Sequence, residues 1–170
     1  MKSSTLNLSE IRYIKLGDID SIHPDILHIF DEAGGDLPSG YQPKFEQQAL
    51  IDALTLSPIT VQHHNIYTYC ISNISSYRIA CSQLMKNTVI PVRYFEGRRG
   101  DKFDRLLAAE LFSNQLILSK PQTPYMHSWL YRVWEQVRLR NPKYNVLKAS
   151  ANKSAFAKAL NVDARGLNDK

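Results

Sequence analysis

The 170-residue sequence has only two cysteines, no apolar run of about 18 residues, and no signal-peptide pattern at its start. Two cysteines cannot form the disulfide framework of a small secreted domain, so we expect Cys70 and Cys81 to be buried thiols without a redox role. Without a long apolar run, no membrane-spanning helix and no membrane partner are expected. These absences favour a cytoplasmic protein.

Residues for metal or acid–base chemistry are also scarce. His63 and His64 are adjacent, but no third ligand lies at a useful spacing, so we predict no metal site. The carboxylates between Glu96 and Glu110 define no pair of the kind that holds a nuclease metal. We therefore expect no catalytic residue, and no cofactor beyond weak nucleotide binding.

The composition is that of a folded chain with an uneven charge. Hydrophobic residues make up 44% of the sequence and charged residues 22%, which suits a packed core. Residues 1–90 carry 6 Lys/Arg and 9 Asp/Glu, a balance of −3, whereas residues 91–170 carry 15 and 7, a balance of +8. A basic half suggests a polyanion partner, most simply DNA, although an unevenly charged surface explains it equally well.

Hydrophobic periodicity predicts an α+β (mixed α/β) fold. A loop rich in Gly and Pro is expected at residues 31–44. We predict an α/β domain at residues 1–119 and an all-helical segment at residues 120–170. The expected strands are 12–19, 58–62, 66–72 and 90–95, with a hairpin turn at HHN, and the expected helices are 46–56, 75–86, 102–117 and 125–140.

The stretch CISNISSYRIAC, residues 70–81, has the pattern of a strand, a polar turn and the start of a helix. Helix N-termini present unpaired N–H groups that attract anions, and Ser75 and Ser76 are candidates for the N-cap. The turn contains no Gly, and Arg78 is its only cation. Such a junction is common, so by itself it is weak evidence for a phosphate site.

The segments around this turn carry a more specific pattern. LIDALTLSPITV precedes it, VIPVRYF follows it, and AAELFSNQLI lies further along the chain. In this order and spacing the chain resembles the N-terminal domain of ParB partition proteins, which is related to the sulfiredoxin fold. The resemblance spans roughly residues 11–167 and is diffuse.

The resemblance implies a nucleotide site whose motifs are degenerate here. Asn73 stands where the family has Gly, and Ser75 and Ser76 replace two arginines. In the second motif Asn114 is kept, but the neighbouring Glu and Arg of the family are absent. The corresponding site residues are Asn73, Ser75, Ser76, Arg78 and Asn114. Since charge-assisted contacts contribute about 1.5–3 kcal/mol each, we expect the turn to keep its shape without binding a triphosphate tightly.

The C-terminal stretch KSAFAKALNVDARGL, residues 153–167, has the spacing of a helix-turn-helix. Asn161 stands at the turn, where it tolerates positive φ, and Asp163 is placed to cap a second helix. Ala157 is small enough for two helices to cross, and Leu160, Val162 and Leu167 are expected to close the core. The second helix would offer Ala164, Arg165 and Asn168 to a major groove, although an ordinary helical hairpin has a similar pattern.

A second basic cluster, GRRGDKFDR, lies at a junction between a loop and a helix. Phosphate contacts there are as plausible as a solvated loop whose cations pair with Asp101 and Asp104. The predicted DNA-binding residues are Arg98, Arg99, Lys102, Arg105, Lys153, Ala164, Arg165 and Asn168.

Together these patterns predict a non-catalytic, ParB-like DNA-binding protein of a plasmid, phage or other mobile element, acting in partition or transcriptional regulation. Two alternatives stay open. One is an enzyme of the same fold, a CTPase or a nuclease-like protein. The other is a protein-interaction module that binds a partner protein or a second copy of itself through the apolar stripe of residues 125–140.

Overall fold

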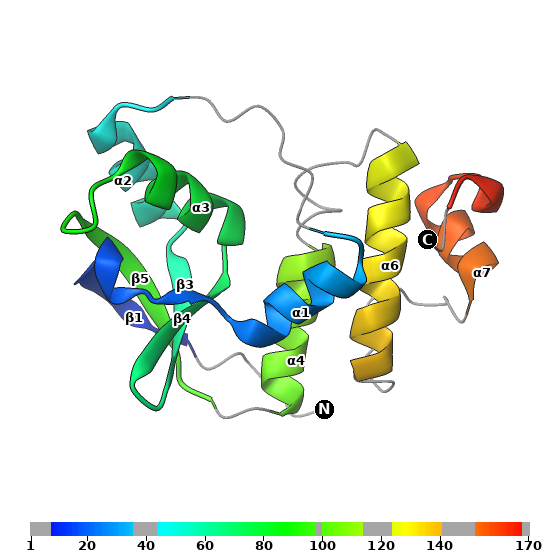
Figure 1. Ribbon diagram of the computed structural model, residues 1–170, viewed down its shortest axis with the longest axis horizontal. Helices are drawn as coiled ribbons and strands as arrows, with labels where there is room; N and C mark the ends of the chain where they lie inside the picture. Colours follow the sequence, from blue (N-terminus) through cyan, green and yellow to red (C-terminus); the bar gives the residue numbers. More distant parts are fainter. Residues whose placement is uncertain (1–7, 36–43, 98–99, 114–123, 141–151, 168–170) are drawn as a thin grey trace. The chain divides into compact units, whose positions relative to one another are not determined.

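The computed structural model describes residues 8–35, 44–97, 100–113, 124–140 and 152–167, and the chain forms two compact units. The α/β unit comprises residues 1–24 and 39–102, and the helical unit comprises residues 25–38 and 103–170. Helices and a mixed sheet are both present, which confirms the predicted α+β class (Figure 1).

The division between the units differs from the predicted boundary after residue 119. Two helices within the first 119 residues, α1 (Pro24–Glu32) and α4 (Asp101–Ala108), belong almost wholly to the helical unit. Their apolar side chains are the reason, because Phe30 of α1 and Phe103 of α4 are fully buried there. Each unit is therefore built from two separate segments of the chain, and no single boundary in the sequence divides them.

The α/β unit contains a five-stranded sheet in the described residues, with the order β1-β5-β3-β4-β2. β1 pairs antiparallel with β5, β5 parallel with β3, β3 antiparallel with β4, and β4 parallel with β2. The strands are β1 (Leu8–Lys15), β2 (Ser21–Ile22), β3 (Ile59–His64), β4 (Tyr67–Ser72) and β5 (Val89–Phe95).

The predicted hairpin between β3 and β4 is confirmed, and Asn65 turns the chain there with φ of 57°. The prediction of a strand at residues 12–19 is wrong at both ends. β1 ends at Lys15, and the 3-10 helix η1 (Leu16–Asp18) follows it. The Asp18 carboxylate accepts a hydrogen bond from the Lys15 N–H at 3.2 Å, and this local bond turns the chain out of the strand.

Helices α2 (Gln47–Leu56) and α3 (Ile74–Gln83) lie on one face of this sheet (Figure 1). α2 uses Leu50 and Leu54, four residues apart, as its buried side. The sheet supplies a matching set of fully buried side chains, namely Ile59, Val61, Cys70, Ile90 and Val92. Burying one such aliphatic side chain stabilises the fold by about 1.5–3 kcal/mol, so this layer fixes α3 and the turn before it.

α3 begins and packs differently from the prediction. Asn73, not Ser75 or Ser76, is its N-cap residue, and its buried side chains are Ile74, Tyr77 and Ala80. The sequence pattern predicts a buried face of Ile79, Ala80 and Leu84; Ala80 is buried as predicted, whereas Ile79 and Leu84 are only half-buried, because the buried face is turned by about one residue. For the same reason Cys81 is exposed, contrary to the prediction, whereas Cys70 is buried as expected.

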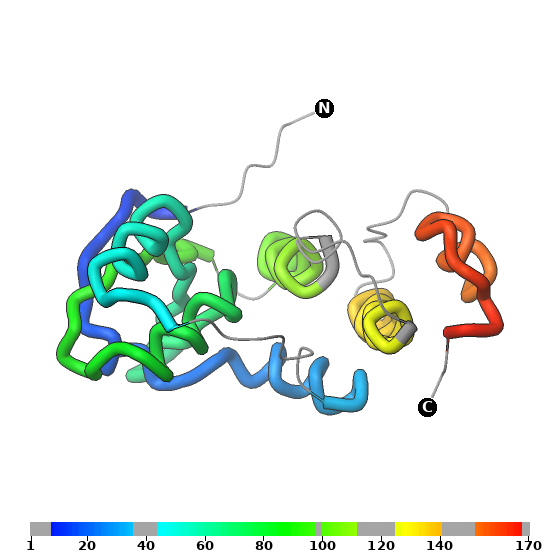
Figure 2. Tube along the Cα trace, turned by 90° about the horizontal axis from the view of Figure 1, so that it is seen from above, coloured from blue at the N-terminus to red at the C-terminus, as the bar shows by residue number. Residues whose placement is uncertain are grey.

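The helical unit is built around α6 (Pro124–Arg140), close to the predicted helix 125–140. All five residues of the predicted apolar stripe are buried: Trp129, Leu130, Val133, Trp134 and Val137. The predicted helix 102–117 is α4 followed by a π-helical turn (Ala109–Ser113), and its remainder lies outside the described residues. Figure 2 shows α4 and α6 nearly end-on, with α7 (Lys153–Leu160) beside α6.

Aromatic side chains join α6 to α7. The Phe156 ring lies 5.3 Å from the Tyr131 ring and 5.2 Å from the Trp134 ring, centroid to centroid. These separations are typical of favourable aromatic pairs. α7 is thus held on α6 by a buried aromatic cluster. In the described part of the chain, no helix combines the length and apolarity needed to cross a membrane.

Candidate functional sites

The turn before α3 keeps the strand–turn–helix geometry that the sequence predicts. Asn73 has φ of 58° and ψ of 43°, the left-handed conformation that Asn tolerates better than most residues. Its side-chain amide donates to the Ser57 carbonyl oxygen at 2.6 Å. Asn73 therefore ties the start of α3 to the end of α2 and does not cap its own helix through its side chain.

The polar residues predicted for this site lie together on the first turn and a half of α3. Ser75 is exposed, and Ser76 and Arg78 are half-buried. The positive end of the helix dipole and the Ser hydroxyls suit an anion, but Arg78 is the one cation that this stretch contributes. Asn114, the fifth predicted residue of the nucleotide site, lies outside the described residues.

A helix followed by a turn lies where the first half of the predicted helix-turn-helix is expected. The Asn152 side chain caps α7 by accepting a hydrogen bond from the Ala155 N–H at 2.9 Å. Asn161 ends the helix with φ of 56°, as its position at the turn predicts. Phe156, Ala157 and Leu167 are buried, whereas Leu160 and Val162 are only half-buried.

The predicted second helix is not found in the described residues. Asp163 does act as the expected N-cap and accepts a hydrogen bond from the Arg165 N–H at 2.9 Å. However, the helix that follows is η3 (Ala164–Gly166), a single 3-10 turn, and Leu167 is already extended. Gly166 has a low helix propensity and occupies a position where a longer helix would need to continue. Asn168 lies outside the described residues.

This short turn changes the expected role of Ala164 and Arg165. Arg165 is 93% exposed and its guanidinium forms an ion pair with Asp163 at 3.2 Å. Hydrogen bonds from the Arg165 backbone and side chain lower the pKa of Asp163 below its ordinary value. An ion pair this exposed contributes little stability. Within the described residues, Ala164 and Arg165 lie on this single 3-10 turn and not on a recognition helix.

The second basic cluster is described only in part. Arg98 and Arg99 lie outside the described residues. Lys102 and Arg105 are on α4, where Lys102 is exposed and Arg105 is half-buried. Asp104, a predicted partner for this loop, accepts a hydrogen bond from Arg140 of α6 at 2.8 Å. The structure therefore does not gather these cations into one described surface.

Arg140 is a partly buried charge that no local pattern in the sequence marks. Its guanidinium also contacts the Asp25 carboxylate of α1 at 2.6 Å, and its side chain is 29% exposed. Burial alone would lower the pKa of Arg140, but the hydrogen bonds that it donates to the Asp104 and Asp25 carboxylates outweigh burial and raise the pKa above its ordinary value. The three residues are 36 and 115 positions apart in sequence, which explains why no spacing pattern could predict them.

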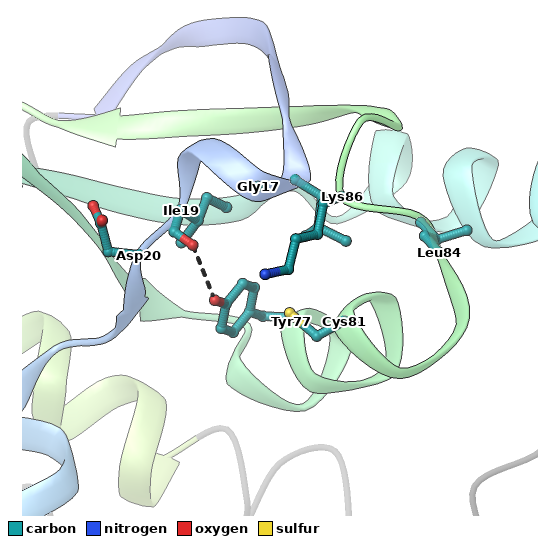
Figure 3. Close-up of a pocket in the computed structure, with 8 residues that line it drawn as sticks. Gly17, Ile19, Asp20, Tyr77, Cys81, Leu84 and Lys86 are labelled. Carbon is teal, nitrogen blue, oxygen red and sulfur yellow. Dashed lines mark hydrogen bonds between the residues drawn. The ribbon is translucent and has the colours of Figure 1, made fainter.

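A cavity beside α3 was also missed. It has a volume of about 330 Å³ and is lined by Asp20, Tyr77, Cys81 and Lys86, among others (Figure 3). Its walls come from segments that are distant in sequence, so no local motif marks it.

Within the described ranges, no group of three His, Cys, Asp or Glu side chains could hold a metal ion. No protein-family model, no curated protein and no solved structure matches the chain.

Proposed function

We propose that this chain is a non-catalytic DNA-binding protein that contacts the phosphates of duplex DNA through the C-terminal basic segment, residues 143–165. It acts in the cytoplasm, in partition or regulation on a plasmid, phage or other mobile element, as the resemblance to ParB proteins implies.

The charge of the C-terminal basic segment is the observation that carries this proposal. The segment contains five cations and one carboxylate, a balance of +4: Lys143, Lys148, Lys153, Lys158 and Arg165 against Asp163. Clustered Lys and Arg neutralise phosphates and release counterions, which is the main source of affinity in sequence-independent DNA binding.

The geometry of α7 also supports phosphate contacts by the C-terminal basic segment. The helix is capped at both ends and held against α6 by the Phe156 cluster, so the exposed Lys158 projects from a rigid element. Lys158 and Arg165 are exposed. Because η3 is a single turn, base readout by a recognition helix is not part of the proposal, and binding is expected to be largely independent of sequence.

The α3 turn supports a role without catalysis. It has a strand–turn–helix conformation, and its principal polar residue, Asn73, is engaged with the backbone of Ser57. With Arg78 as its single cation, the turn is poorly equipped to stabilise the charge of a reacting triphosphate.

The test is duplex DNA binding by fluorescence anisotropy in low salt, with a double variant, Lys158→Gln with Arg165→Gln. Both side chains are exposed, so the fold should survive, and the loss of two phosphate contacts should weaken binding by about tenfold or more. An arbitrary duplex and a duplex enriched by selection should be affected alike, because the contacts are to phosphates.

The matched control is Lys15→Gln with Lys44→Gln, which removes two exposed cations from the α/β unit. This variant should bind DNA within about twofold of the unmodified chain. Equal losses in both double variants would show that net charge, not the C-terminal basic segment, determines binding. If the unmodified chain binds no duplex, the proposal fails.

A further inference from the structure

β1 is a long, open edge of the five-stranded sheet. It pairs with β5 on one side, and no described strand pairs with its other side (Figure 1). The strand at the opposite edge, β2, has two residues, whereas β1 has eight. An exposed edge of this length is a template on which another strand can pair. This edge belongs to the α/β unit, so it is separate from the proposed DNA contacts of the helical unit.

Hydrogen bonds to β5 and the turn before it show which backbone groups of β1 face the open side. The Leu16 N–H donates to the Thr88 carbonyl oxygen at 2.9 Å, so these two residues face each other across the pair. In an antiparallel pair, facing residues recur at every second position, and Arg12, four positions before Leu16, therefore also faces β5. The N–H and C=O groups of Ile11 and Tyr13 consequently point away from β5, toward the open edge.

The side chains along this edge are exposed and alternate in character. Tyr13 is 64% exposed and Ile11 is 37% exposed, and the two share one face of the sheet. Glu10 and Arg12, which are also exposed, alternate to the other face. The ion pair of Arg12 with Glu96 is long, at 4.0 Å, and both side chains are at least 60% exposed. Such a pair contributes little stability, so exchanging Glu96 for another carboxylate costs little.

We propose that β1 pairs antiparallel with β1 of a second copy of this chain, about a two-fold axis at Ile11. In this register the two Ile11 residues exchange backbone hydrogen bonds, and Glu10 of each copy lies opposite Arg12 of the other. Opposite charges directly across two strands stabilise a sheet. The pairing also covers part of the exposed apolar surface of Ile11 and Tyr13.

Charge complementarity selects this register over its neighbours. Because outward-facing residues must oppose one another, the axis can lie at Ile11, Arg12 or Tyr13. An axis at Arg12 places two arginines directly opposite each other, which destabilises a sheet. An axis at Tyr13 places Ile11 opposite Lys15, and the Lys15 N–H is already bonded to the Asp18 carboxylate at 3.2 Å. The axis at Ile11 is the one that pairs opposite charges.

The test is sedimentation equilibrium of the intact chain, without DNA, over about a hundredfold range of concentration. The unmodified chain should change from monomer to dimer as its concentration rises. Glu10→Arg and Arg12→Glu should each weaken dimerisation by about tenfold or more, because each opposes like charges at both cross-strand pairs. All of these side chains are exposed, so the fold should survive.

The double variant, Glu10→Arg with Arg12→Glu, restores opposite charges across the two strands. It should dimerise within about threefold of the unmodified chain. An equimolar mixture of the two single variants should form a mixed dimer more tightly than either variant pairs with itself. This rescue is specific to the Ile11 axis, because the other registers do not bring residues 10 and 12 together.

Ile11→Pro tests the backbone pairing. It removes the outward-facing N–H at the axis without removing a hydrogen bond to β5, so it should weaken dimerisation by about tenfold or more. Its circular dichroism spectrum should stay that of the unmodified chain. The matched control for the charge reversals is Lys44→Glu, at an exposed position away from β1, which should leave dimerisation unchanged.

The inference is overturned if the unmodified chain stays monomeric over the whole range, or if the double variant dimerises no better than the single ones. The variant Lys158→Gln with Arg165→Gln keeps β1 intact and should dimerise as the unmodified chain does. Loss of DNA binding with normal dimerisation, or the reverse, therefore distinguishes failure of the proposed function from failure of this inference.

Discussion

At the scale of single residues, three asparagines determine how the chain turns. Asn65, Asn73 and Asn161 are the described residues other than glycine with positive φ, and each ends or begins a regular element. The left-handed conformation costs most other L-residues about 1–2 kcal/mol. Asn73 has a second role as well, because its side chain binds the Ser57 carbonyl oxygen.

Replacing Asn73 separates these two roles. Asn73→Gly keeps the backbone conformation but loses the hydrogen bond to Ser57, and it should lower the free energy of unfolding by about 1 kcal/mol. Asn73→Ala loses the bond and also forces alanine into the left-handed region, so it should cost about 1 kcal/mol more than the glycine variant. Urea denaturation of both variants measures the difference. Equal stability of the two variants would mean that backbone strain at residue 73 is unimportant.

The roles of some turn and cap residues follow from the local sequence alone. The left-handed conformation of Asn161 and the capping role of Asp163 could be predicted from local sequence. Asn tolerates positive φ, and the Asp163 carboxylate accepts from a backbone N–H only two residues away. The role of Asn73 could not, because its partner is 16 positions away and the pairing depends on how α2 meets α3. The exposure of Cys81 was also unpredictable without the true start of α3.

At the scale of elements, Arg140 links three helices of the helical unit. Its guanidinium binds Asp25 of α1 and Asp104 of α4, and both carboxylate side chains are 17% exposed. A half-buried cation with two carboxylate partners satisfies charges that would otherwise be costly to bury. The pairing explains why α1 belongs with α4 and α6 in one unit.

Arg140→Met should therefore destabilise the helical unit by about 2 kcal/mol, because it leaves two carboxylates near each other without their cation. Arg140→Lys, which keeps the charge but cannot bond to both carboxylates in the same planar geometry, should fall between methionine and the unmodified chain. Urea denaturation followed by tryptophan fluorescence reports on this unit, since both tryptophans lie on α6.

The pH dependence of this effect follows from the direction of the pKa shift. The pKa of Arg140 is raised in the folded state, so its stabilising effect is complete below its ordinary pKa and is lost only at much higher pH. The cost of Arg140→Met should be the same at about pH 6 and about pH 9. A cost that disappears between these values would show that Arg140 does not act as the permanent cation of this cluster.

The α3 turn leads to a separate prediction at the same scale. CTP with Mg²⁺ should bind weakly or not at all, because this turn contributes a single cation, Arg78, to a triphosphate. Isothermal titration with CTP measures it, and ATP and GTP serve as controls for base preference. A dissociation constant in the low micromolar range or tighter would show that the turn is a working nucleotide site.

Regular elements with a clear periodicity were predicted best. α6 and the hairpin of β3 and β4 follow directly from apolar spacing and turn residues. α1 was missed, although Pro24 at its first position and Asp25 in its first turn are recognisable start signals. The second helix of the C-terminal motif was predicted wrongly, because the spacing of apolar residues is satisfied equally well by the 3-10 turn η3.

At the scale of the whole molecule, the charge asymmetry of the sequence does not coincide with the two units. The α/β unit has 10 Lys/Arg and 7 Asp/Glu, a balance of +3, and the helical unit has 11 and 9, a balance of +2. The change has two sources: the acidic residues Asp25, Asp31, Glu32 and Asp36 belong to the helical unit, and residues 91–102, with a balance of +2, belong to the α/β unit. The positive charge that remains distinctive is that of the C-terminal basic segment.

The central claim is that this segment binds the DNA backbone, and the salt dependence of duplex binding tests it most directly. The logarithm of the association constant should fall linearly with the logarithm of salt concentration, by about 0.9 for each phosphate contacted. Three to five contacts predict a slope of about −3 to −4.5, reduced by about 2 in the variant Lys158→Gln with Arg165→Gln. A slope near zero, or one that this variant leaves unchanged, would contradict the account.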